Sequence, residues 1–212
     1  MTNIQPAEHS HGIDLENALE FLNTLHPGHG RDDEAHQRDE HLATPAEAAA
    51  WLLEHDLIHP EAVVRIGEAD VRRIRDVRTA LREVFDAVVE GRTPLADAVH
   101  LVNATLEARR PTRIELDGSA IRIGHRHASS PVDDAMALIA EAIVEELAAG
   151  RPERFRICAN DRCRWAFYDF SPAARRRWCD MRTCGNQAKA ARYRARRKAE
   201  EEAQAAPAAR LN

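Results

Sequence analysis

Apolar residues recur with helical spacing along much of the first 150 residues. Between residues 13 and 25, one face of an amphipathic helix is formed by Leu15, Ala18, Leu19, Leu22 and Leu25. The segment Thr44–Glu47 has the form of a capping box, so a second helix is expected to begin there and to end near Glu54. The polar residues 1–12 and 26–43 lack this period, which predicts disorder in the first and a mobile loop in the second.

The longest helical pattern covers residues 68–90 and stops at Gly91. Its apolar face consists of Val71, Ile74, Val77, Leu81, Val84, Phe85 and Val88. A short helix is expected before it, at 60–66. Another is expected after it, at 94–109, with four buried side chains: Leu95, Val99, Val102 and Leu106.

The period changes to two at residues 112–124, where apolar residues alternate on both sides of Asp117-Gly118, as in a β-hairpin. Ser130 then caps a last helix that ends at Gly150 and buries Val132, Met136, Ile139, Ile143 and Leu147. The pattern predicts a mostly α fold in which residues 1–150 form a helical domain with one hairpin. Residues 151–200 form a second, small domain, and residues 201–212 form a disordered tail.

The four cysteines of the chain all lie in the small domain, at Cys158, Cys163, Cys179 and Cys184. Their spacing, C-x4-C-x15-C-x4-C, provides two short pairs joined by a loop, which suits tetrahedral Zn²⁺. Four thiolates close the coordination shell, whereas a catalytic zinc normally keeps one position open to water. The sequence therefore predicts one structural zinc per chain.

Two disulfides or an iron–sulfur centre are the alternatives for four clustered cysteines. Residues 1–20 lack the apolar core of a signal peptide, so we expect a cytoplasmic protein in a reducing compartment, which disfavours disulfides. No apolar run approaches the roughly 20 residues of a membrane span. Spacing alone leaves the iron–sulfur alternative open.

Charge divides the chain at the same place as the hydrophobic pattern. Residues 1–150 carry 14 arginines and 28 carboxylates, a net charge of −14, whereas residues 151–212 carry 16 cations and 7 carboxylates, a net charge of +9. Such an asymmetry indicates a polyanionic partner for the basic part. The candidate contacts for DNA are Arg175, Arg176, Arg177, Arg182, Lys189, Arg192 and Arg196.

Three of these candidates, Lys189, Arg192 and Arg196, share one face of a helix that is predicted from Ala188 to Lys198. Before it, Arg164–Phe170 is an aromatic, strand-like run, and Ser171-Pro172 has the form of a helix start.

The residues around the cysteines resemble the CGNR zinc fingers, in the pattern R-x-C-x4-C-x-W-x-F-Y-D followed by R-R-W-C-x-M-x-x-C-G-N-Q. In that family the finger follows an N-terminal domain called ABATE, described as a stress-induced transcription regulator. The segments Glu20–Leu25 and Ala43–Glu47, with Trp51-Leu52, resemble that domain. Gln187 stands where the family has arginine, and it lacks the charge and the bidentate fork of a guanidinium.

Other side chains carry less specific signals. Trp165, Phe167, Tyr168, Phe170 and Trp178 are expected to fill the core of the finger, with base stacking as the alternative. Six histidines in the first 41 residues (His9, His11, His26, His29, His36 and His41), with His125 and His127 after the hairpin, are expected to be exposed and not to bind metal. Asn23 is expected to be exposed, with a role in an effector pocket as the alternative.

Taken with the resemblance, these features predict a DNA-binding transcriptional regulator with a helical domain that dimerises, binds an effector, or both. The alternative is a finger that binds proteins, or a self-associating scaffold without specific DNA binding. We expect no enzyme, because the chain shows no nucleophile–base pair, phosphate-binding loop or paired carboxylates.

Overall fold

The computed structural model of the chain describes residues 13–27, 38–108, 113–117, 120–124, 130–149 and 151–205. It divides the chain into two compact units. The helical unit comprises residues 1–25 and 39–153, and the finger unit comprises residues 26–38 and 154–212. Residues 1–12 and 28–37, for which the sequence predicts disorder and a mobile loop, lie outside the described residues, as do His125 and His127.

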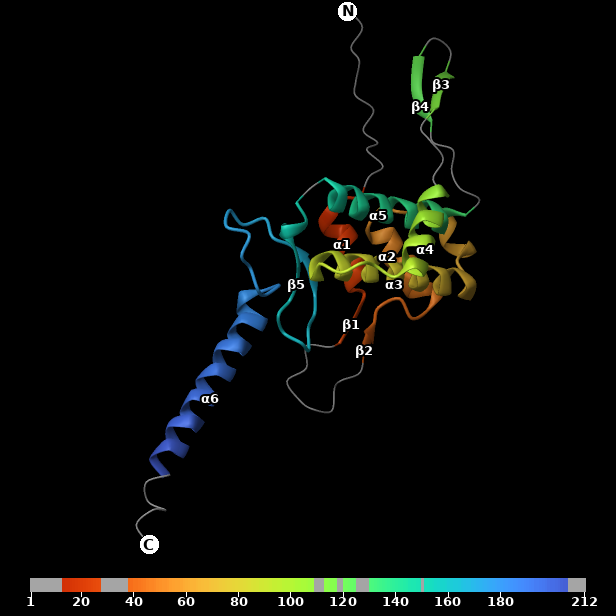
Figure 1. Ribbon diagram of the computed structural model, residues 1–212. Coiled ribbons are helices and arrows are strands. Elements are labelled where there is room, and N and C mark those ends of the chain that lie inside the picture. Colours follow the sequence, from red (N-terminus) through yellow and green to blue (C-terminus); the bar gives the residue numbers. More distant parts are fainter. Residues whose placement is uncertain are drawn as a thin grey trace, which may run out of the picture. The chain divides into compact units, whose positions relative to one another are not determined.

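Within its described residues, the helical unit is built from five α-helices: α1 (Leu15–Asn23), α2 (Pro45–Glu54), α3 (Glu68–Glu90), α4 (Ala96–Glu107) and α5 (Pro131–Ala148). The long helix α3 contacts each of the other four, and α5 also packs against α1 and α4 (Figure 1). The largest fully buried side chains include Phe21, Phe85, Ile74, Leu81, Met136 and Ile139. The predicted apolar faces of α3 and α5 therefore form the centre of this core, and the mostly α class is confirmed.

The ends of these helices follow the local signals in the sequence. Thr44 accepts a hydrogen bond from the Glu47 backbone N–H, and the Glu47 carboxylate accepts one from the Thr44 N–H, which completes the capping box of α2. Gly91 ends α3 with a left-handed backbone (φ 68°) that favours glycine. The short helix η1 (Pro60–Arg65) is a 3₁₀-helix.

Three side chains lie elsewhere than expected. Leu95 is 64% exposed and Val99 is 38% exposed, although the spacing predicts burial of both. The helix α4 begins only at Ala96, and it buries Ala98, Val102 and Thr105 instead. Asn23, expected to be exposed, is only 2% exposed because its amide donates a hydrogen bond to the Leu19 carbonyl at 2.9 Å.

The predicted hairpin is present as β3 (Arg113–Asp117) and β4 (Ala120–Gly124), which pair antiparallel with Ile114 opposite Ile123. A second two-stranded sheet, which the sequence pattern does not predict, joins β1 (Leu25–Pro27) to β2 (Arg38–Glu40). The His41 N–H donates to the Thr24 carbonyl at 2.9 Å beside this sheet. Backbone pairing of this kind needs no apolar alternation, which explains why the sequence analysis missed it.

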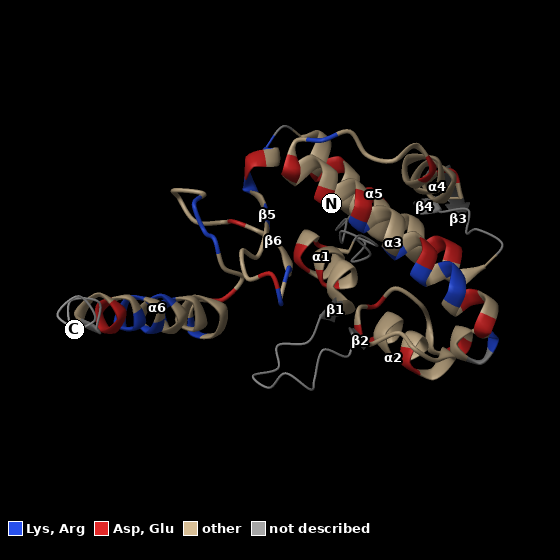
Figure 2. Ribbon diagram, turned by 60° about the horizontal axis from the view of Figure 1, so that its bottom comes forward, with Lys and Arg blue, Asp and Glu red and all other residues tan. Residues whose placement is uncertain are grey.

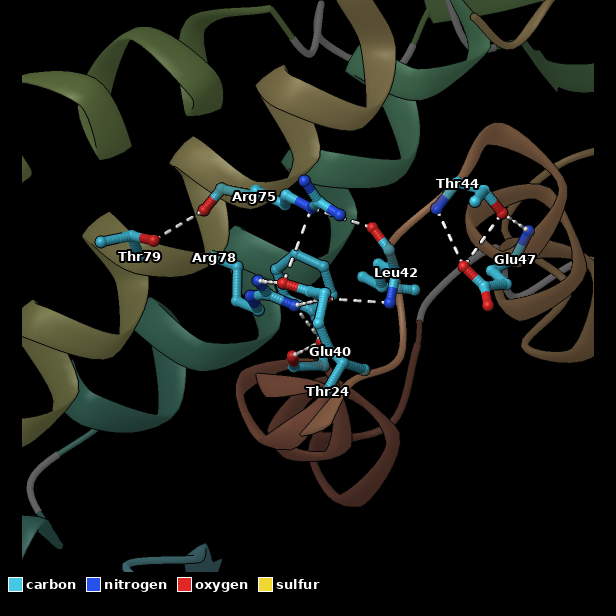
Figure 3. A network of polar contacts seen from close by, with 9 residues as sticks. Thr24, Glu40, Leu42, Thr44, Glu47, Arg75, Arg78 and Thr79 are labelled. Carbon is cyan, nitrogen blue, oxygen red and sulfur yellow. Dashed lines mark hydrogen bonds and ion pairs between the residues drawn. The ribbon is translucent and has the colours of Figure 1, made fainter. Parts of the chain in front are cut away.

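An ion pair with a buried arginine fastens the end of β2 to α3. Both oxygens of the Glu40 carboxylate accept hydrogen bonds from the Arg78 guanidinium, at 2.7 and 2.5 Å, and Arg78 also donates to the Thr24 hydroxyl (Figure 3). The side chain of Arg78 is 3% exposed and that of Glu40 is 22% exposed. Arg75 lies beside the pair and donates to the Leu42 carbonyl. Arg78, a buried residue of α3, therefore holds the segment around Glu40 against that helix.

The finger unit contains β5 (Phe155–Ile157), β6 (Ala166–Tyr168), the π-helix η3 (Met181–Gly185) and α6 (Asn186–Ala205), and the one-turn helix η2 (Pro152–Arg154) precedes it. Strands β5 and β6 pair antiparallel. Ser171-Pro172 forms a turn, closed by the Ala174 N–H and the Ser171 carbonyl, and starts no helix. Helix α6 extends to Ala205, further than its predicted end at Lys198. None of the described helices combines the length and apolar character needed to cross a membrane.

Candidate metal centre and basic surface

The four cysteine sulfurs converge on one point of the finger unit. All of their Sγ atoms lie within 4.8 Å of one another, and the Cys179 sulfur is 3.7 Å from that of Cys163 and 3.9 Å from that of Cys184. Four sulfurs about 2.3 Å from a tetrahedral zinc lie about 3.8 Å apart. The cluster therefore has the size of a site for a single metal ion.

This geometry also bears on the two alternatives. No disulfide joins the cysteines, and their separation is far longer than the roughly 2.05 Å of a sulfur–sulfur bond. An iron–sulfur cluster places several metal atoms between its thiolates and needs a wider cage than one ion. Four thiolates also leave no position for substrate or water, so the site is a structural zinc centre.

The first cysteine pair lies on the turn between β5 and β6. The Asn160 carbonyl accepts hydrogen bonds from the backbone N–H groups of Cys163 and Arg164, at 2.8 and 3.0 Å. Arg164 adopts a left-handed backbone (φ 49°), a conformation that side-chain-bearing residues seldom occupy. The Cys158 N–H donates to the Trp165 carbonyl, which closes the turn and directs both thiols to the same side.

The second pair is held by the π-helix η3. Asp180 begins this helix and accepts a hydrogen bond from the Arg182 N–H at 2.7 Å, and Cys184 occupies the last turn before α6. Because η3 continues directly into α6, the position of Cys184 also sets the direction in which α6 leaves the finger. Figure 1 shows α6 as a long helix that starts at the finger.

The thiols are poor acids without a metal. Burial raises the pKa of the Cys158 thiol to about 11. The hydrogen bond with Cys163, together with burial, raises the pKa of Cys179 well above its usual range. Zinc binds thiolates, so metal binding must displace these protons, which couples zinc affinity to pH.

The side chain of Asn160 lies against a sulfur of the metal site. Its side-chain oxygen accepts a hydrogen bond from the Arg162 N–H at 3.1 Å, which leaves its amide group to act as the donor. That amide lies 3.5 Å from the Cys184 sulfur and 3.2 Å from the side-chain oxygen of Gln187. Gln187 therefore acts as an acceptor, which the arginine of the family pattern cannot do.

Most of the aromatic residues line the metal site, as predicted. Phe167 is buried with Cys158, Cys163 and Cys184, and the partly buried Trp165 and Trp178 pack against this cluster. Tyr168 is buried as well and contacts Phe155 edge to face. Phe170 differs, because it is 59% exposed and lies against the ring of Tyr168. The core of the finger thus depends on a few aromatic rings around the thiols.

A buried carboxylate shapes the loop that carries the arginine cluster 175–177. Asp169 is fully buried, and its two oxygens accept hydrogen bonds from the backbone N–H groups of Ser171 and Arg176, at 3.0 and 2.8 Å. Burial alone would raise the pKa of Asp169, but these hydrogen bonds outweigh it and the pKa is lowered. Arg154 and Arg156 donate to carbonyl groups of the same loop. These contacts were not predicted, and Asp169 in the run F-Y-D was their only sequence signal.

All seven predicted DNA contacts are exposed, but they are not equivalent. The Arg176 guanidinium donates to the Cys179 carbonyl and lies over the Phe167 ring, so it supports the metal site. Arg196 pairs with Glu200 at 3.6 Å. No carboxylate partner within the described residues neutralises the other five: Arg175, Arg177, Arg182, Lys189 and Arg192.

Charge is unevenly spread along α6. Cations occupy its first part, and acidic residues gather towards its end (Figure 2). Arg197 and Lys198 pair with Glu201 and Glu202 one turn later, as Arg196 does with Glu200. Residues 189–204 are exposed on every side of the helix. The uncompensated positive charge therefore lies at the end of α6 that is nearest the zinc site.

Comparison with known families agrees with this architecture. Residues 16–150 match ABATE, with the description "Putative stress-induced transcription regulator", and residues 154–197 match the CGNR zinc finger. The comparison with curated proteins found no match. The ABATE match spans most of the chain and ends two residues after α5, and the finger match includes all four cysteines. The chain therefore belongs to the ABATE family, and its C-terminal part is a CGNR zinc finger.

Proposed function

We propose that the chain is a transcriptional regulator that binds DNA through its finger unit. The observation that carries the proposal is the set of exposed cations without carboxylate partners beside the zinc site: Arg175, Arg177, Arg182, Lys189 and Arg192. Guanidinium groups suit phosphate oxygens because they donate two parallel hydrogen bonds. The family description points in the same direction.

Zinc acts as a scaffold in this proposal. Its ligands come from both cysteine pairs, so the ion would tie the β5–β6 turn to η3 and hence to α6. A core of a few aromatic rings is too small to fold alone, and such modules depend on metal for stability. Loss of zinc should therefore abolish DNA binding without any direct contact between metal and DNA.

The shape of α6 also suits DNA. An α-helix with its side chains is about 10–12 Å across, close to the roughly 12 Å width of the major groove. Because residues 189–204 are exposed on all sides, no described part of the finger unit would have to move aside for the helix to enter a groove. The acidic end, Glu200–Glu202, would lie outside the phosphate backbone.

The helical unit would pair two copies of the chain, because two fingers read two half-sites and so multiply specificity. Exposed Leu95 and Val99 lie one turn apart at the start of α4, and they are the exposed large apolar side chains among the described side chains of the helical unit. Replacement of both with glutamine should shift a dimer towards monomer in sedimentation equilibrium. An unchanged mass would place the contact elsewhere. An effector could bind the same unit and alter the pairing.

The decisive experiment selects DNA from a mixture. Zinc-loaded protein is incubated with fragmented genomic DNA at about 0.15 M salt, and the bound fragments are recovered and sequenced. Enrichment of a few sites near promoters supports a specific regulator, and their spacing gives the arrangement of half-sites. The control is the Cys179→Ser variant, which keeps every cation but loses a zinc ligand.

Two results would contradict the proposal. Equal recovery of all fragments would indicate a nonspecific binder held by phosphate contacts alone. No recovery, together with oligomers that dissociate at high salt, would indicate that the basic finger meets an acidic protein surface instead. The opposite charges of the two parts of the chain, −14 and +9, make a second copy the first partner to test.

A further inference from the structure

A groove of about 1080 Å³ lies beside the zinc site, entirely within the finger unit. One wall is the turn of the first cysteine pair, and the other is the first two turns of α6 together with η3. Its polar groups come from Asn160, Asp161, Arg162, Arg182, Asn186, Gln187 and Arg194. Trp178 and the small side chains Ala188, Ala190 and Ala191 complete the lining.

The groove lies on a different side of α6 from Lys189, Arg192 and Arg196, which form the basic face predicted from the sequence. Gln187, Ala191 and Arg194 line the groove, as expected for positions three, four and seven residues apart on a helix. At about 100° per residue, Lys189 and Arg196 lie roughly 160–180° around the helix from Gln187. Arg194, which lines the groove, therefore lies on the opposite side of α6 from Lys189 and Arg196, which the sequence indicates as candidate DNA contacts.

The lining is suited to an anion. Three guanidinium groups, those of Arg162, Arg182 and Arg194, stand against one carboxylate, Asp161. Neither Arg182 nor Arg194 has a carboxylate partner among the described residues of the finger unit. Exposed guanidinium groups without a carboxylate partner can donate charge-assisted hydrogen bonds to phosphate oxygens, whereas a guanidinium that already pairs with a carboxylate has fewer free donors.

The size of the groove favours a chain over a small molecule. Pockets for small ligands are typically about 300–1,000 Å³ and enclose most of the ligand, whereas this groove is at the upper end of that range, is open to solvent and has exposed arginines. The alanines of α6 leave its backbone accessible, and Trp178 offers an apolar surface to a sugar. A sugar–phosphate backbone, with a charge at every repeat and an apolar sugar between charges, matches both features.

We propose that this groove holds the sugar–phosphate backbone of one DNA strand. The inference rests on the proposed function and adds the orientation of α6: the helix lies along the major groove, with one strand in the finger groove and the other beside Lys189 and Arg192. Helices that enter the major groove have a phosphate backbone on each flank, which explains why cations occur on two opposite sides of α6.

Gln187 provides a test by gain of binding. It lies in the groove as a neutral side chain whose oxygen accepts the Asn160 hydrogen bond. The substitution Gln187→Arg adds a cation where the groove already holds three, at the loss of one exposed hydrogen bond at 3.2 Å. If a phosphate lies there, binding should tighten and depend more steeply on salt.

The experiment measures the affinity for a fluorescently labelled DNA duplex of mixed sequence across a salt series. Each phosphate contact contributes about 0.9 to the slope of log K against log salt. The double variant Arg182→Ala/Arg194→Ala should lower the slope by about 1.8, and Gln187→Arg should raise it by about 0.9. The matched control, Arg65→Ala/Arg72→Ala, removes the same charge from exposed positions of the helical unit and should leave the slope unchanged.

The outcomes distinguish a failure of the proposed DNA-binding function from a failure of the groove proposal alone. Each variant must first show one zinc per chain and the wild-type melting temperature. Wild-type protein that binds no duplex even at low salt would overturn both the function and the groove. Wild-type binding with unchanged slopes in the groove variants would overturn the groove alone. Slopes that fall equally in the control would show a response to net charge and would also overturn it. Loss of salt-sensitive self-association, with DNA binding intact, would assign the groove to an acidic protein.

Discussion

Arginine has opposite roles in the two units of this protein. On α3 of the helical unit, Arg73, Arg78 and Arg82 each pair with a carboxylate, at 2.6, 2.5 and 2.8 Å. Near the zinc site of the finger unit, Arg182, Arg192 and Arg194 have no such partner among the described residues. The residue type is the same, so composition alone cannot distinguish a structural arginine from one that is available to a ligand.

The difference lies in what the fold places next to each guanidinium. The partner of Arg78 is Glu40, which is 38 residues away in sequence and meets α3 because the fold places the end of β2 beside that helix. In the finger, the backbone turns bring thiols and carbonyl groups together, and the carboxylates of α6 reach only the cations one turn before them. Free positive charge is therefore concentrated at the junction of η3 and α6.

The largest effect is expected from removal of the scaffold that presents the free arginines. Cys179→Ser leaves three thiolates, and the finger unit should lose stoichiometric zinc and its fixed structure because its core is too small to fold without metal. Metal analysis and near-ultraviolet circular dichroism test this, with Thr183→Ser as the control that keeps all four ligands. The helical unit should melt as in wild type. A metal-free variant that still bound DNA would contradict the structural role of zinc.

The next largest effect is expected from loss of the ion pair between Arg78 and Glu40 in the helical unit. Arg78→Met leaves the Glu40 carboxylate without its bidentate partner and should lower the free energy of unfolding of the helical unit by about 3 kcal/mol. Chemical denaturation measures this change. The control, Arg72→Met, lies on the exposed side of the same helix and should change stability by less than about 0.5 kcal/mol. Equal effects of the two substitutions would refute the importance of the pair.

Acid should weaken the same pair. Burial alone would raise the pKa of Glu40, but the hydrogen bonds from Arg78 and Leu42 outweigh it, so the pKa is lowered from 4.5. A carboxyl with a lowered pKa in the folded state stabilises the fold above its unfolded pKa, and this contribution is lost as the pH falls through the folded value. Wild type should therefore lose more stability than Arg78→Met below about pH 4.5. Parallel pH profiles of denaturation midpoints would show that Glu40 contributes nothing.

The smallest effect is expected from single substitutions in α6, where an unpaired and a paired arginine can be compared. Arg192 and Arg196 lie on the same side of the helix, but only Arg196 has a carboxylate partner, Glu200. If the outer side of α6 faces phosphates, Arg192→Ala should lower the salt slope of DNA binding by about 0.9, and Arg196→Ala should lower it by less. Duplex titrations across a salt series measure both. A larger loss with Arg196→Ala would mean that DNA displaces Glu200 from the pair.

Much of the fold followed from local patterns. The periods of residues 68–90 and 112–124 identified α3 and the hairpin, and the capping box at Thr44 placed the start of α2. These features depend on interactions between residues a few positions apart, so the sequence alone is enough to predict them. The cysteine spacing likewise predicted a compact four-thiol site, because metal geometry allows few arrangements of two short pairs.

The sequence pattern failed where a residue's environment is set by distant segments. Leu95 and Val99 share the period of a buried face, yet they are exposed because α4 packs through Ala98 and Val102 instead. Asn23 is polar but buried, and Arg176 lies in a basic run but supports the metal site. Local spacing predicts the faces of a helix, but it does not show which face the rest of the fold covers or that Arg176 lies over the Phe167 ring.

The sequence by itself determined the order of the helices, the hairpin, the four metal ligands and the division of charge between the two parts. Only the tertiary structure decided which cations are already neutralised, and it brought Arg162 of the first cysteine turn into one groove with Arg194 of α6. The physical reason is the sequence distance over which the different interactions act. Helix periods, caps and metal-ligand spacing act over a few residues, whereas the charge that a surface offers to a partner depends on which carboxylates, amides and guanidinium groups the folded chain brings within a few ångströms of one another.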